Sequence, residues 1–286
     1  MSPQPQLDCL LSGLAFGESP RWHEGRLWFC NWGTGEIIAM DEAGGSQVML
    51  HVPTTLPYCI DWLPDGRLLV VSGREALLLR QEASGALVTH CDLRGLSRQP
   101  WNEIVVDTGG NIYVNGGGPT PPEGQMFGPG TITLIRPDGS ATVVADRIAF
   151  ANGMAISPDG KTLICAESFG RSLLGFDIAG DGTLSNRRAW AALGSGTPDG
   201  ISMDAEGAVW YADVPKKCCV RVREGGEIVD RIELDRGGFA CMLGGADRRT
   251  LFILASEFRG FEHMFSDRRD GVVYAARVAV PGAGRP

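Results

Sequence analysis

One element recurs six times along the chain: an apolar run, a tight turn and a second apolar run. The turns follow one another at intervals of 41 to 50 residues, at Gly25, Gly66, Gly110, Gly160, Gly207 and Arg249. Repeats of about 40 to 50 residues built from short apolar runs are typical of β-propellers, in which each repeat supplies one blade of four strands. The repeat therefore predicts an all-β, six-bladed β-propeller with four-stranded antiparallel blades around a central channel, in which residues 1–286 form a single domain.

The ends of the chain bear on how such a ring closes. An open strand edge invites pairing with other chains, so a propeller has to join its first and last blades. Residues 7–14 precede the first repeat, and we expect them to complete the last blade. Residues 116–130, rich in Gly and Pro, lengthen the third repeat; they are expected to form an irregular loop, either a lid or an idle surface excursion.

Composition excludes several classes of partner. The formal net charge of -8 argues against nucleic acid, which requires a clustered basic face. No apolar run reaches the roughly 20 residues that cross a bilayer, and the first residues lack the pattern of a secretory signal. The eight cysteines are scattered, and the adjacent pair Cys218-Cys219 could bridge only with strain. We therefore expect reduced thiols and a cytoplasmic protein without membrane or nucleic-acid partners.

```
```

One residue stands seven or eight positions before each turn, and these residues are Glu18, Cys59, Asn102, Asn152, Asp199 and Cys241. If the repeats are equivalent, these residues ring one mouth of the channel. Four of them carry oxygen donors, and two carboxylates and two amides, completed by waters, suit Ca²⁺. Mg²⁺, Mn²⁺ and Zn²⁺ remain alternatives. The two cysteines are expected to line this metal-binding channel as small apolar groups.

A simpler interpretation exists for each of these residues. Asn152 and Asp199 both precede glycine and could be ordinary turn residues, and Glu18 could lie in a surface turn. Their shared offset favours the metal site, because turn chemistry does not require acidic or amide residues at one position in four repeats of six. His23 follows Glu18 in the same apolar run, and in the channel it could assist proton transfer. The chain lacks a hydrolase nucleophile elbow, a P-loop and a dinucleotide fingerprint.

Four segments carry a resemblance to a known family: FGESPRW at 16–22, WNEIVVDTGGNIYV at 101–114, FANGMAISPDGKTL at 150–163 and TPDGISMDAEGAVWYAD at 197–213. In this order and spacing the chain resembles the regucalcin, senescence marker protein and gluconolactonase family of six-bladed propellers. The resemblance implies one divalent cation, usually calcium, held by Glu18, Asn152 and Asp199, with Asn102 in the metal shell or at the substrate. It also implies hydrolysis of a small-molecule lactone, with the cation as Lewis acid and Asp199 as base.

The chain departs from the family pattern beside Asn102. Members that act on sugar lactones often have an arginine just before this position, whereas this chain has Trp101. We therefore expect a substrate less polar than gluconolactone, with Tyr58, Met126 and Phe127 as further substrate contacts. Two alternatives remain: organophosphate hydrolysis at the same site, as in diisopropyl fluorophosphatase, and a non-catalytic calcium-binding propeller scaffold.

Overall fold

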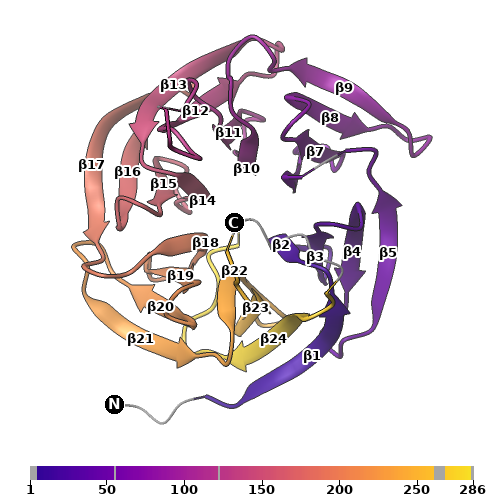
Figure 1. The fold of residues 1–286 in the computed structure, drawn as a ribbon, viewed down its shortest axis with the longest axis vertical. Coiled ribbons are helices and arrows are strands. Elements are labelled where there is room, and N and C mark those ends of the chain that lie inside the picture. Colours follow the sequence, from indigo (N-terminus) through magenta and orange to yellow (C-terminus); the bar gives the residue numbers. More distant parts are fainter. Residues whose placement is uncertain (1–4, 55, 122, 261–267, 285–286) are drawn as a thin grey trace.

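The structure is a computed structural model that describes residues 5–54, 56–121, 123–260 and 268–284. Six four-stranded antiparallel sheets are arranged as blades around one axis (Figure 1). This arrangement confirms the predicted six-bladed β-propeller.

The strands are grouped by their position in the blade. The innermost strands are β2 (Gly17–His23), β6 (Tyr58–Trp62), β10 (Trp101–Val106), β14 (Ala151–Ile156), β18 (Pro198–Met203) and β22 (Gly237–Gly244). The second strands are β3 (Arg26–Asn31), β7 (Leu68–Ser72), β11 (Ile112–Gly116), β15 (Thr162–Glu167), β19 (Val209–Asp213) and β23 (Thr250–Ser256). The third strands are β4 (Glu36–Met40), β8 (Leu77–Gln81), β12 (Gly130–Ile135), β16 (Ser172–Ile178), β20 (Cys218–Val222) and β24 (Gly271–Arg277). The outer strands are β5 (Ser46–His51), β9 (Leu87–Asp92), β13 (Ala141–Ile148), β17 (Leu184–Ala192), β21 (Ile228–Glu233) and β1 (Leu7–Leu14).

The ring closes through both ends of the chain. Strand β1 pairs antiparallel with β24, from Leu7 opposite Ala276 to Leu14 opposite Gly271. The last blade therefore has the order β1-β24-β23-β22, and Figure 1 shows indigo β1 beside yellow β24. Since this blade draws on both ends of the chain, its assembly holds the ring shut.

The core is divided among the interfaces between neighbouring blades. One cluster joins Leu69 and Val71 of β7 to Trp101 and Ile104 of β10, and all four side chains are almost fully buried. A second cluster joins Trp210 of β19 to strands of the last blade. Because inner strands have a neighbouring blade on each side, both of their faces are apolar, which explains the continuous apolar runs of the sequence.

The innermost strands differ in regularity. Strand β6 pairs with β7 without interruption. The other five pairings shift register, between Glu18 and Arg21, Trp101 and Glu103, Ala151 and Met154, Pro198 and Ile201, and Gly238 and Ala240. Such bulges re-aim side chains relative to the regular alternation of a strand, and four of them lie at the predicted metal ligands.

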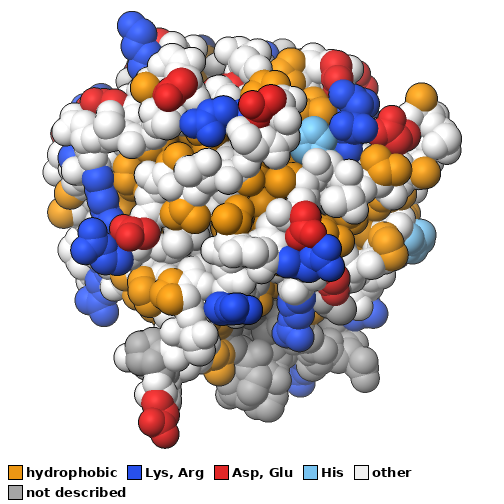
Figure 2. Space-filling model, turned by 90° about the horizontal axis from the view of Figure 1, so that it is seen from above, with side chains coloured by type: hydrophobic (Ala, Val, Ile, Leu, Met, Phe, Trp, Pro, Cys, Tyr) orange, Lys and Arg blue, Asp and Glu red, His pale blue; other side chains and the backbone are white. Residues whose placement is uncertain are grey.

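All eight cysteines are free thiols; Cys9 is exposed and the other seven are buried. Among the described residues, no helix is long and apolar enough to cross a membrane. On the side of the molecule shown in Figure 2, basic and acidic side chains are intermixed.

Candidate active site and metal centre

A cavity of about 570 Å³ opens at the end of the axis where the innermost strands begin. Its walls come from the segments that lead into these strands and from the connections between second and third strands. Glu18, Asn102, Asn152 and Asp199 all line it. Each is the second residue of its innermost strand, so the structure brings together the four oxygen-bearing residues that the repeat singled out.

The two carboxyl groups of this set are partly exposed to the cavity, and the surrounding protein raises the pKa of both. Burial, followed by the negative charge of Asp199, raises the pKa of Glu18 well above its ordinary value. Burial also raises the pKa of Asp199 to about 8, although a hydrogen bond from Asn152 acts in the opposite direction. Within the described ranges, neither carboxylate forms an ion pair with a Lys, Arg or His side chain. The site therefore disfavours the ionised form of both carboxyls, and the Arg21 charge offsets this only in part for Glu18.

The two amides are positioned by hydrogen bonds, that of Asn152 to its own blade and that of Asn102 to the neighbouring one. The Asn152 side chain donates to Ser168 Oγ at 3.4 Å, and Ser168 Oγ donates to the Pro198 carbonyl oxygen at 2.7 Å. The Asn102 amide nitrogen donates to the Ala151 carbonyl oxygen at 3.4 Å. Because the amide nitrogens point to protein acceptors, the amide oxygens remain available as ligands.

These residues fit a divalent cation. Two carboxylates and two amide oxygens are the hard donors that Ca²⁺ and Mg²⁺ prefer, and a cation would offset the repulsion between the two carboxylates. No cluster of three His, Cys, Asp or Glu side chains able to hold a metal occurs among the described residues. The present donor set differs from such a cluster because half of it consists of asparagines.

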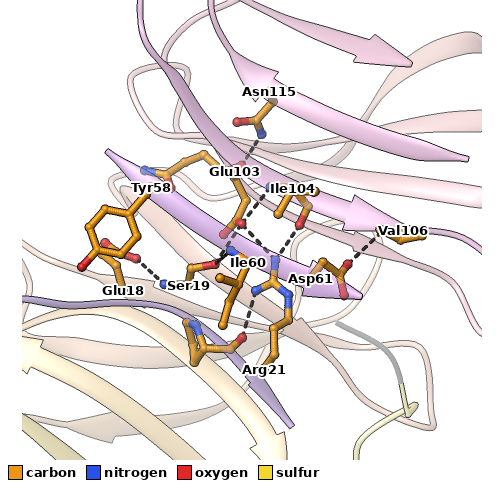
Figure 3. A network of polar contacts seen from close by, with 12 residues as sticks. Glu18, Ser19, Arg21, Tyr58, Ile60, Asp61, Glu103, Ile104, Val106 and Asn115 are labelled. Atoms are coloured by element: carbon orange, nitrogen blue, oxygen red, sulfur yellow. Dashed lines mark hydrogen bonds and ion pairs between the residues drawn. The ribbon is translucent and has the colours of Figure 1, made fainter. Parts of the chain in front are cut away.

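A second buried polar group lies deeper along the axis and centres on Arg21 (Figure 3). Arg21 Nη2 forms an ion pair with Glu103 Oε1 at 2.9 Å and also donates to the Ile104 carbonyl oxygen. Glu103 Oε1 accepts from the Ile104 amide at 2.8 Å and from Ser19 Oγ at 3.4 Å. Ser19 Oγ in turn accepts from the Ile60 amide at 3.0 Å, so this network ties the first three blades together.

Asp61 of β6 belongs to the same region. Its carboxylate accepts from the Val106 and Trp62 amides, both at 2.8 Å. Burial raises the pKa of Asp61 to about 6, with the nearby Arg21 charge acting against the rise. Sequence reasoning did not single out Arg21, Glu103 or Asp61, although each lies within three residues of a marker position; charged residues inside apolar inner strands were the signal that could have revealed them.

The structure does not bring Trp101 or Tyr58 to the cavity, which corrects their expected role as substrate contacts. Trp101 is fully buried and packs in the cluster between the second and third blades. Tyr58 is also buried, and its hydroxyl donates to the Asn31 carbonyl oxygen at 2.6 Å. Successive side chains of a strand point to opposite faces, so a residue next to a cavity-facing Asn102 is directed into the interface between blades.

His23 also lies away from the predicted site. It lines a separate cavity of about 270 Å³ at the other end of the innermost strands, and its ring stacks on Trp62 at 4.0 Å between centroids. A strand rises about 3.3 Å per residue, so five residues separate His23 from Glu18 by roughly 16 Å. The proton-transfer role considered for His23 is therefore not supported by its position.

Cys59 and Cys241 are likewise absent from the lining of the cavity. Cys59 belongs to the regular strand β6 and packs between the second and third blades. In the last blade Phe239, at the β22 bulge, faces the cavity, whereas Cys241 donates to the Gly200 carbonyl oxygen. The offset does not locate the cavity-facing residue here, because Phe239 lies nine positions before Arg248, the turn residue that has the positive φ, at 57°.

The 116–130 loop contributes directly to the cavity. Met126 and Phe127 line it, as predicted, together with glycines of the same loop. Gln99 anchors the loop: its amide nitrogen donates to the Pro119 carbonyl oxygen at 2.7 Å, and its amide oxygen accepts from the Gly128 amide at 2.8 Å. The loop therefore forms part of the wall.

The fold and the cavity place this protein in the class of six-bladed β-propellers that have oxygen donors at one end of the axis. Residues 16–257 match the family described as the SMP-30/gluconolactonase/LRE-like region, and the chain belongs to this family. This confirms the resemblance found in the sequence.

Individual relatives span nearly the whole chain. The chain is 28% identical over 284 residues to 6-deoxy-6-sulfogluconolactonase of Pseudomonas putida, covering 94% of each protein. Among solved structures, luciferin-regenerating enzyme has a TM-score of 0.82 at 18% identity and 97% coverage of both chains. Regucalcin of Agrobacterium tumefaciens, described as a calcium-binding protein, has a TM-score of 0.80 at 21% identity, covering 99% of this chain and 97% of its own. The two structures support the fold.

Proposed function

We propose that this protein hydrolyses a lactone with the help of one divalent cation, in the first instance Ca²⁺. The observation that carries the proposal is the convergence of Glu18, Asn102, Asn152 and Asp199 on one cavity, with two carboxylates that lack an ion-pair partner among the described residues. The similarity to a sulfogluconolactonase supports the reaction class. The similarity to a calcium-binding regucalcin supports the cation.

In the proposed site Glu18, Asn152 and Asp199 hold the cation through side-chain oxygens, and Asn102 completes its shell or orients the substrate. When bound there, a cation would supply a Lewis acid for the lactone carbonyl and for the negative charge that develops on its oxygen.

Asp199 is the proposed base. One of its carboxylate oxygens accepts a proton from the attacking water while the water oxygen bonds to the acyl carbon. The ring carbon–oxygen bond then breaks, and the leaving alkoxide takes back the proton that Asp199 accepted, which gives the open hydroxy acid.

A substrate panel with metal exchange tests the proposal. The purified protein would be stripped with EDTA and reloaded separately with Ca²⁺, Mg²⁺, Mn²⁺ or Zn²⁺, then assayed with aldonolactones, aliphatic lactones, aryl esters and organophosphates. We expect lactone hydrolysis that disappears with EDTA and returns with a cation. Activity on organophosphates alone would show that the reaction is organophosphate hydrolysis and not lactone hydrolysis. Cation-dependent stability without any hydrolysis would favour a non-catalytic calcium-binding scaffold.

A further inference from the structure

The walls of the cavity are far more apolar than its polar end. On one side Phe150 packs against Phe127 and Phe169, with ring centroids 4.8 Å and 4.6 Å away. On the other side Phe239 packs against Phe258 at 6.1 Å. Phe127, Phe150, Phe169, Phe239 and Phe258, which we call the aromatic walls, all line the cavity.

The outer part of these walls is unusually exposed. Among the described residues with large exposed hydrophobic side chains, three line this mouth: Met126 at 64%, Phe169 at 58% and Phe258 at 41%. Phe150 also has a φ of 64°, which bulky residues rarely adopt. Exposed apolar side chains that gather at one cavity mark a binding surface for an apolar group.

Polar partners on the walls are scarce. Gln99 lines the cavity, but its amide nitrogen and oxygen are already bonded to the 116–130 loop. Ser168 is engaged with Asn152 and the Pro198 carbonyl oxygen. Beside these and the oxygen donors, Arg74 and Thr197 are the other charged or hydroxyl side chains of the lining. Sugar hydroxyls held against the aromatic rings would therefore gain few hydrogen bonds for the water they lose, which opposes their binding.

We infer that the substrate is an amphipathic lactone, whose ring reaches the oxygen donors and whose alkyl or aryl substituent lies between the aromatic walls. This inference rests on the proposed function and names the substrate class for the same site. The volume of about 570 Å³ lies in the range of about 300 to 1,000 Å³ typical of pockets for drug-sized ligands. It leaves space for a substituent beyond the ring.

A series of δ-lactones of increasing side-chain length tests the inference with the cation-loaded full-length protein. The series runs from δ-valerolactone through δ-octanolactone to δ-decanolactone, with D-glucono-δ-lactone as the polyhydroxylated member. We expect kcat/KM to rise about fourfold for each methylene that enters the cavity, from the transfer free energy of a methylene group. Most of this rise should appear as a lower KM.

Wall variants identify where the substituent lies. Phe169→Ser should lower kcat/KM for δ-decanolactone about tenfold and leave δ-valerolactone within twofold. Ile228→Ser is the matched control, since Ile228 has the same 58% exposure but lies on outer strand β21. Ile228→Ser should leave kcat/KM unchanged for both δ-decanolactone and δ-valerolactone.

The outcomes separate the two claims. A preference for gluconolactone over every alkyl lactone, or a flat chain-length series, would overturn the amphipathic substrate while leaving lactone hydrolysis in place. An equal loss for short and long lactones in Phe169→Ser would also overturn it. Failure to hydrolyse any member of the series with any cation would instead reject the proposed function.

Discussion

Two groups of carboxyls lie along the propeller axis, one buried and one partly exposed at the larger cavity, and their surroundings differ. Glu103 has an Arg21 ion pair at 2.9 Å, and Asp61 receives two backbone amides near the same guanidinium. Glu18 and Asp199 face the cavity without an ion-pair partner among the described residues, and each has a raised pKa. The strand β2 contributes to both groups, since it carries Glu18 and Arg21 three residues apart.

The difference separates a structural group from a functional one. The Arg21 network supplies its own counter-charge and joins three blades. The Glu18–Asp199 pair costs folding free energy when both groups are ionised, and a bound cation would remove that cost. Asp61 also has a raised pKa, so the lack of an ion-pair partner among the described residues, together with the raised pKa values, marks Glu18 and Asp199 as candidates for function.

The largest expected effect is on catalysis. Asp199→Asn should lower kcat for the best lactone by about 10²- to 10⁴-fold, the usual contribution of a general base, and it also removes a proposed metal ligand. Steady-state kinetics at saturating cation measure the loss. Asp230→Asn on β21 is the control and should retain full activity; near-wild-type turnover by Asp199→Asn would rule out its assigned role.

The next effect is on stability. Glu103→Gln leaves the buried Arg21 guanidinium without its ion-pair partner, and the free energy of unfolding should fall by about 3 to 5 kcal/mol. Denaturant unfolding of the metal-free protein measures this change. Glu227→Gln, which breaks the exposed pair with Arg223, should cost less than about 1 kcal/mol. Equal losses for the two variants would contradict a structural role for the network.

Because of Asp61, the free energy of unfolding should depend on pH. Its pKa is about 6 in the folded protein, above the ordinary value of 3.8, so the folded state binds its proton more tightly. The stability from this protonated carboxyl is fully present below pH 3.8 and is lost as the pH rises through 6. Relative to Asp61→Asn, the wild type should lose about 2 to 3 kcal/mol over this window, at about 1.4 kcal/mol per pKa unit. A constant difference between pH 4 and 7 would show that Asp61 does not titrate there.

The smallest expected effect is the change in stability of a Glu18 variant, and it tests most directly whether the two groups of carboxyls differ. Glu18→Gln removes one of two repelling carboxylates, and the metal-free variant should be more stable than the wild type by about 1 kcal/mol at neutral pH. Saturation with Ca²⁺ to about 100 times Kd should stabilise the wild type by about 2.7 kcal/mol and the variant far less. Thermal unfolding with and without Ca²⁺ measures both the stability of the metal-free proteins and the stabilisation by Ca²⁺. A metal-free variant less stable than the wild type would place Glu18 among the structural carboxyls.

The sequence was sufficient for the fold and for four site residues because both depend on the repeat. Glu18, Asn102, Asn152 and Asp199 keep one offset from a turn, and bulges then direct them into the same cavity. The same offset failed at Cys59, whose strand has no bulge.

The cavity walls were less predictable, because they depend on loops and on side-chain direction. The sequence indicated an apolar substrate through Trp101, which in fact packs in the core. The aromatic side chains that do line the cavity include Phe150, Phe169 and Phe239. Phe150 and Phe239 each stand two positions before a marker residue, Asn152 and Cys241, so the repeat aligns them, but the sequence alone did not show that they face a cavity.

The most direct test is an anomalous-scattering map from a crystal soaked in Mn²⁺ and, separately, in Ca²⁺. The account predicts one strong peak at the polar end of the larger cavity, within coordination distance of side-chain oxygens of Glu18, Asn152 and Asp199. A peak elsewhere, or none at saturating cation, would contradict a metal-assisted active site.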